Sequence, residues 1–69
     1  MATIKELTYN YNVKENVKEL DLSSTSNFKL YQILDLDEFV NLRALILSNN
    51  MIGKIENLGN LTKLKILNL

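Results

Sequence analysis

The chain lacks two of the side chains that enzymes use most often for proton transfer, nucleophilic attack and metal binding. Its 69 residues include no histidine and no cysteine, which removes the commonest general base, the commonest metal ligands and the thiolate nucleophile. The closest carboxylate cluster is Asp35, Asp37 and Glu38. Its members are near neighbours in sequence rather than the opposed, environment-tuned pair that acid–base catalysis needs. We therefore expect a non-enzyme without cofactor or metal, and we interpret this cluster as a solvated face.

One polar residue has spacing that indicates a structural role. Asn50 follows Leu47 at the point where a leucine-rich segment is expected to turn. Its side-chain amide can donate two hydrogen bonds and accept others, so it can satisfy backbone groups inside the turn. Thr25 occupies the equivalent place in the preceding unit. We interpret Asn50 as a turn-forming residue rather than a ligand-binding one.

The elements around Asn50 follow a repeating apolar pattern. From Leu42 the chain reads L-x-x-L-x-L-x-x-N-x-I-x-x-I-x-x-L-x-x-L, and the frame restarts at Leu64. A looser copy precedes it and begins at Val17. This spacing is that of a leucine-rich repeat, in which each repeat forms a short strand and then a looser or helical return. The pattern predicts an α/β fold: a solenoid with parallel strands on the concave face and an N-terminal cap.

The predicted organisation is a cap over residues 1–16 followed by repeats over 17–69. Residues 17–41 form an irregular first repeat, 42–63 a regular one, and 64–69 the start of an incomplete third. We expect about two helical turns between Phe28 and Phe39, with Leu30, Ile33, Leu34 and Leu36 covering the core. Because an incomplete repeat leaves an apolar strand edge open, we expect an N-terminal piece of a longer protein that continues or self-associates through that edge.

The segment before the first repeat, 1–16, fits two patterns. Ile4, Leu7 and Tyr11 fit one face of a helix, whereas Leu7, Tyr9, Tyr11 and Val13 alternate as in a strand. Either element would cover the open end of the first repeat. We favour a helix over residues 3–10, and we expect the tyrosines to pack in the cap.

Strand alternation predicts which side chains face a partner, because residues two apart point to the same side. Leucines at positions 20, 22, 45, 47, 67 and 69 should point inward. Parallel strands lie about 4.8 Å apart, so Asp21, Ile46 and Asn68 should form one row across the sheet. The predicted partner-binding residues on the concave face are Glu19, Asp21, Ser23, Ala44, Ile46, Ser48, Ile66 and Asn68.

The charge balance restricts the class of partner. Eight basic and eight acidic residues cancel, which removes the broad attraction that drives binding to nucleic acids or anionic membranes. The beginning of the chain, residues 1–17, has no continuous apolar stretch of the signal-peptide kind. We expect protein partners, no nucleic acid and no membrane, and an intracellular protein.

Several motifs also resemble one family of repeat proteins. The regular repeat is similar to those of intracellular leucine-rich repeat proteins such as phosphatase-1 regulatory subunits and axonemal dynein light chains. The irregular first repeat resembles the N-terminal cap of the acidic leucine-rich nuclear phosphoproteins through Val17-Lys18-Glu19-Leu20, the serine-rich turn at 23–27, Lys29-Leu30, and Asp37-Glu38-Phe39-x-x-Leu42-x-x-Leu45. Ile4 with Glu6-Leu7 fits that family's capping helix.

This resemblance implies a nuclear or nucleocytoplasmic regulator of phosphatases and chromatin that works without catalysis. The chain departs from the family in lacking the proline after the capping helix and the acidic C-terminal tail. It is also slightly longer than the family pattern after the capping helix and before Asp37. The alternative is a structural or regulatory subunit of a phosphatase-1, axonemal dynein or splicing assembly.

Overall fold

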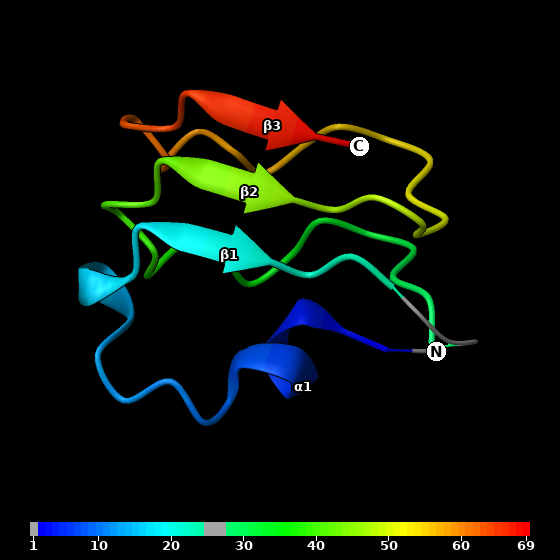
Figure 1. The fold of residues 1–69 in the computed structure, drawn as a ribbon, viewed down its shortest axis with the longest axis horizontal. Coiled ribbons are helices and arrows are strands. Elements are labelled where there is room, and N and C mark those ends of the chain that lie inside the picture. The colour runs from blue at the N-terminus through cyan, green and yellow to red at the C-terminus, as the bar shows by residue number, and fades with distance from the viewer. Residues whose placement is uncertain (1, 25–27) are drawn as a thin grey trace.

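The fold is built around one small parallel sheet. In the computed structural model, which describes residues 2–24 and 28–69, the elements are α1 (Ile4–Thr8), the 3₁₀ helix η1 (Lys14–Asn16), β1 (Glu19–Asp21), β2 (Ala44–Ile46) and β3 (Ile66–Asn68). The strands lie in the order β1-β2-β3 and both pairs are parallel (Figure 1). The predicted α/β class and parallel sheet are thus confirmed.

The strands pair in the register that the leucine spacing predicted. Asp21 pairs with Ile46, and Ile46 pairs with Asn68. The ladder extends beyond the strand ends, because the amide of Leu22 donates to the Ile46 carbonyl at 2.8 Å and that of Ser24 donates to the Ser48 carbonyl at 3.1 Å. Equivalent segments of successive units therefore meet without a shift, and the predicted row across the sheet is present.

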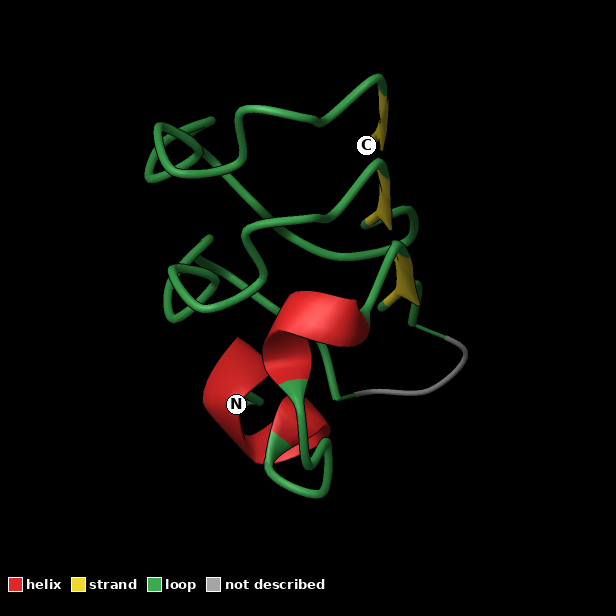
Figure 2. Cartoon of the chain, turned by 90° about the vertical axis from the view of Figure 1, so that its left-hand side faces the viewer, coloured by secondary structure: helices red, strands yellow, loops and turns green. Residues whose placement is uncertain are grey.

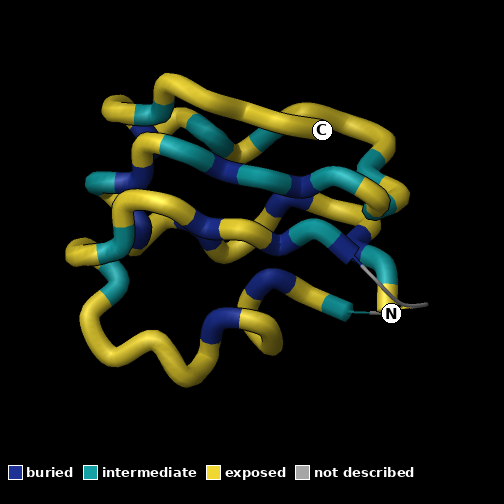
Figure 3. The backbone as a smooth tube through the Cα atoms, viewed as in Figure 1, coloured by how far each residue is buried: buried dark blue, intermediate teal, exposed yellow. Residues whose placement is uncertain are grey.

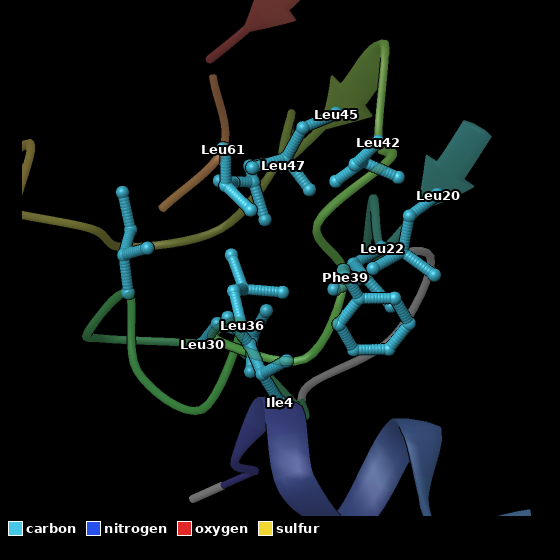
Figure 4. Packing of buried hydrophobic residues seen from close by; sticks show 11 residues of the cluster. Ile4, Leu20, Leu22, Leu30, Leu36, Phe39, Leu42, Leu45, Leu47 and Leu61 are labelled. Carbon is cyan, nitrogen blue, oxygen red and sulfur yellow. The ribbon is translucent and has the colours of Figure 1, made fainter. Parts of the chain in front are cut away.

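The core lies between the sheet and the return segments that run behind it. The inward leucines of β1 and β2 and the segments that follow them are buried, as predicted, together with apolar residues of the first return (Figures 3 and 4). Leu67 and Leu69 are 36% and 51% exposed, because no segment in the described part of the chain lies over the outer side of β3. The buried cluster is Ile4, Leu20, Leu22, Leu30, Ile33, Leu36, Phe39, Leu42, Leu45, Leu47 and Leu61.

The helix expected between Phe28 and Phe39 is absent, and that prediction was wrong. This segment consists of bends and turns, and Figure 2 shows the returns as loops on the side away from the strands. Its buried residues recur every third position, at Leu30, Ile33, Leu36 and Phe39, while Leu34 is 43% exposed. An α-helix would bury residues at a spacing of 3.6, so the regular spacing of three fits a chain that turns in short segments.

A left-handed residue explains why the return cannot be helical. Asp35 has φ 63°, and Asn57, at the equivalent place in the second return, has φ 60°. Aspartate and asparagine tolerate this conformation better than other non-glycine residues, but it breaks a right-handed helix. The Asn57 side chain also donates to the Ile33 carbonyl at 2.8 Å and so ties the second return to the first.

The cap begins with a short helix, as favoured from the sequence, but the helix spans only Ile4–Thr8. Thr3 and Glu6 form a capping box at its start. Its buried face is Ile4 and Thr8, whose hydroxyl donates to the Ile4 carbonyl at 2.8 Å. Leu7 is 44% exposed, so the predicted face containing Leu7 was wrong.

The remainder of the cap reaches the core through one aromatic contact. Tyr11 meets Phe39 edge-on, with ring centroids 6.1 Å apart, which confirms packing for this tyrosine. Tyr9 and Tyr31 are exposed, and for them the packing prediction was wrong. Ala2 forms a parallel bridge with Leu30, so the first described residue joins the returns rather than the sheet.

Asn50 joins three parts of the chain. Its side-chain nitrogen donates to the carbonyls of Leu22 at 2.9 Å and Leu47 at 3.1 Å, with a longer contact to that of Ser48. Its side-chain oxygen accepts from the Leu30 amide at 2.8 Å. The structural role is confirmed, and it reaches beyond the residue's own turn into the preceding unit. Thr25, its predicted counterpart, lies outside the described residues.

We predict that Asn50→Ala lowers the free energy of unfolding by about 1–3 kcal/mol, because the buried backbone groups it serves lose their partner. Asn60→Ala is the matched control. Asn60 is exposed, and its truncation should change stability by less than about 0.5 kcal/mol. Chemical denaturation of both variants measures the difference. Equal unfolding midpoints would show that the Asn50 bonds contribute nothing.

Candidate protein-binding surface

The eight predicted partner-binding residues lie together on one side of the sheet, which we call the sheet face: Glu19, Asp21, Ser23, Ala44, Ile46, Ser48, Ile66 and Asn68. They form rows because the strands are in register. One row joins Glu19, Ala44 and Ile66, and the next joins Asp21, Ile46 and Asn68. The ladder bonds beyond β1 and β2 place Ser23 beside Ser48. All eight are exposed or half-buried, so each is accessible to a partner.

The chemical character of the sheet face changes across the strands. β1 contributes the carboxylates of Glu19 and Asp21, whereas the central positions are Ala44 and Ile46. Ile66 on β3 is 57% exposed. A surface with an acidic margin and an aliphatic centre offers contact area and charge selectivity, but no reactive group.

Local hydrogen bonds hold the Asp21 carboxylate. One of its oxygens accepts from both the Ser23 hydroxyl at 2.7 Å and the Ser23 amide at 3.0 Å. These bonds stabilise the charged form and hold the pKa of Asp21 below its ordinary value of 3.8, with the hydroxyl bond contributing most. Asp21 thus carries a full negative charge at neutral pH, in a fixed position on the sheet face.

The other sequence-identified cluster lies away from the sheet face. Asp35, Asp37 and Glu38 are exposed and, with Lys5 and Lys14, line a shallow depression of about 150 Å³. In the described ranges no three acidic, histidine or cysteine side chains are grouped closely enough to hold a metal ion. The location agrees with a solvated face.

A second depression lies at the open end of the sheet. Its volume is about 240 Å³, and it is bordered by Leu47, Asn50, Ile52, Gly53, Lys54, Ile55 and Leu69. Ile55 is 59% exposed, whereas Ile33, which occupies the same place in the preceding unit, is fully buried. The difference arises because the second return covers Ile33, and no comparable segment among residues 2–24 and 28–69 covers Ile55.

One feature that the sequence reasoning missed is a line of basic residues. Lys18, Arg43 and Lys65 each immediately precede a strand, and all three are exposed. The sequence repeat already indicates this row, because each basic residue directly follows the first apolar residue of its repeat: Val17, Leu42 or Leu64. We define Lys18, Arg43 and Lys65 as the basic row.

No helix in residues 2–24 and 28–69 combines the length and apolar character needed to cross a membrane.

The carboxylate geometry yields a pH prediction. Ser23→Ala removes the hydroxyl that donates to Asp21, so the pKa of Asp21 should rise toward 3.8. Because the folded-state pKa is depressed, the stabilisation is present above the unfolded-state pKa and is lost as pH falls through the folded-state value. Carboxyl chemical shifts measured by NMR during an acid titration follow this change.

Ser48→Ala is the control for that titration. Ser48 lies beside Ser23 in the segment that follows β2, and neither described bond of the Asp21 carboxylate involves it. An equal rise of the Asp21 pKa in both variants would show that the Ser23 hydroxyl is not its cause.

Searches against family models, curated proteins and solved structures found no match for this chain.

Proposed function

We propose that this chain is a non-catalytic protein-interaction module, built as the cap and first repeats of a leucine-rich repeat solenoid. The observation that carries the proposal is the sheet face, where three strands from successive units place equivalent side chains in uninterrupted rows. A rigid face of this kind can contact an extended or folded partner with several side chains at once. The two strand pairs and the Asn50 bonds fix its geometry in advance, so little entropy is lost on binding.

The class of parent protein follows from the resemblance. The cap motifs at 17–20 and 37–39 favour a nuclear or nucleocytoplasmic regulator of phosphatases and chromatin, similar to the acidic leucine-rich nuclear phosphoproteins. In such a regulator the sheet face would bind the partner and the returns would remain in solvent.

The exposed aromatic side chains favour a second candidate function. Tyr9 is 81% and Phe28 72% exposed, and Tyr31 and Leu34 add apolar area outside the sheet face. Large exposed apolar groups away from one binding face are typical of proteins buried within an assembly. The alternative is therefore a structural subunit of a phosphatase-1, axonemal dynein or splicing complex, contacted on both sides.

We predict that peptides selected for binding to this chain from a random library perturb the NMR signals of Ser23, Ile46 and Asn68. Ile46→Lys should abolish their binding, because it places a charge in the aliphatic centre of the sheet face. Val40→Lys adds the same charge at a β-branched residue that is exposed outside the sheet face and should leave binding unchanged.

Perturbations confined to the returns, with binding insensitive to Ile46→Lys, would overturn the sheet-face proposal. Perturbations on both sides would favour the structural alternative. Melting curves of the two variants separate loss of binding from loss of fold.

A second contact surface is the free edge of β3. Within the described residues β3 pairs with β2 alone, and Ile55, Leu67 and Leu69 expose apolar surface beside that edge. Unpaired strand edges with apolar neighbours promote association. We propose that a second copy of this chain packs there.

We predict that the 69-residue chain self-associates in sedimentation experiments as its concentration rises. Leu67→Lys should suppress this association by placing a charge at the edge, whereas Leu34→Lys, a similarly exposed leucine on the return, should not. A strictly monomeric wild-type chain with protected amides from residue 64 to 69 would contradict the prediction.

A further inference from the structure

The basic row is continuous across the sheet. The Arg43 amide donates to the Lys18 carbonyl at 2.7 Å, and the Lys65 amide donates to the Arg43 carbonyl at 2.8 Å. The three residues are thus neighbours on adjacent chain segments, spaced by about 4.8 Å along the hydrogen-bonding direction. In Figure 1 the turns that lead into β1, β2 and β3 lie one above another on one side of the molecule. The repeat places a cation at the same point of each turn.

Two further cations lie on the same turns. Lys63 donates from its side-chain nitrogen to the Asn41 side-chain oxygen at 2.7 Å, and the Lys14 nitrogen lies 5.8 Å from the centre of the Phe39 ring. With the basic row, these make five of the chain's eight basic residues. Basic residues thus gather at or near the amino-terminal ends of the strands, although the formal net charge of the chain is zero.

The basic row has no internal counterion in the described part of the chain. The ion pair found there joins Lys54 to Glu56 at 3.7 Å, on the second return. Like charges directly opposite one another on adjacent strands are destabilising. The three exposed cations just before the strands therefore repel one another, and an anionic group placed over them would relieve that repulsion.

We propose that the basic row binds an acidic segment of a protein partner, one rich in aspartate or glutamate, laid across the amino-terminal ends of the three strands. This rests on the proposed function, since it assumes a protein partner. The aliphatic positions Ala44 and Ile66 directly follow two of the cations. The structure thus offers an acidic segment a basic margin, and offers the apolar residues beside that segment the centre of the sheet face.

A protein segment fits this surface better than a nucleic acid does. The Glu19 carboxylate follows Lys18 directly, and the Asp21 carboxylate stands on the same strand. A protein segment can change from acidic to apolar residues where it leaves the row, whereas a nucleic acid carries a phosphate at every nucleotide and would meet repulsion there. Single-stranded nucleic acids also bind through aromatic side chains on which bases stack. The sheet face, as defined above, contains none.

The test compares two variants that each remove one positive charge. A fluorescently labelled peptide of about six glutamates is titrated with the 69-residue chain, and binding is followed by anisotropy. Arg43→Gln should weaken binding about two- to fivefold, as expected for loss of one exposed ion pair. Lys54→Gln should leave it unchanged. Replacing Lys18, Arg43 and Lys65 together by glutamine should abolish detectable binding while the melting curve stays close to wild type.

Salt dependence and a second probe complete the experiment. Binding should weaken strongly between about 0.05 M and about 0.5 M salt, because exposed charges are screened within about 10 Å at about 0.1 M. Equal weakening by Arg43→Gln and Lys54→Gln would overturn the proposal, since it would reflect net charge alone. Tighter binding of an oligothymidylate of equal charge would overturn it in favour of a nucleic acid.

The result also separates this inference from the function on which it rests. If the library-selected peptides still require Ile46 and the triple glutamine variant binds the glutamate peptide like wild type, the sheet face remains and the acidic partner is excluded. If Ile46→Lys leaves those peptides bound while the triple variant loses the glutamate peptide, the basic row acts without the sheet face.

Discussion

The side-chain amide of Asn50 is the interaction on which the remaining structure depends. A turn that leaves a strand and runs back across the core carries backbone amides and carbonyls away from water, and these need partners. Asn50 supplies them for its own turn at Leu47 and for the preceding unit at Leu22 and Leu30. The ends of neighbouring strands are thereby held at a constant distance from each other. This keeps the strands in register and the leucine side chains directed inward.

Two other asparagine side chains make similar bonds to backbone carbonyls, but each donates only one described bond. Asn57 reaches the Ile33 carbonyl, and Asn41 reaches the Glu15 carbonyl at 2.7 Å while accepting from Lys63. Each of the two donated bonds joins a residue to the unit before it. Ile33 is buried where the second return packs against it, whereas Ile55, 22 residues later, is exposed in the described part of the chain.

Much of the fold could be predicted from sequence because the strands obey a strict period. The alternation of Leu45 and Leu47 with Ile46 determined both the core and the sheet face, and the repeat of leucines set the register. The return between Phe28 and Phe39 was wrongly predicted to be helical, because apolar residues at spacings of three and four are also typical of a helix. The left-handed conformation at Asp35, which breaks a helix, depends on packing that the pattern does not encode. The basic row could have been identified from the sequence, but the search for catalytic groups did not identify it.

The two units differ in length, and this difference affects how the sequence of such a chain can evolve. The path from β1 to β2 is longer than the path from β2 to β3, yet both pairs meet in register. The additional length of the first unit is therefore absorbed outside the sheet, because units that stack along one axis need not be equal in length. Insertions in the loops can therefore change one side of the molecule while the residues of the sheet face stay in place.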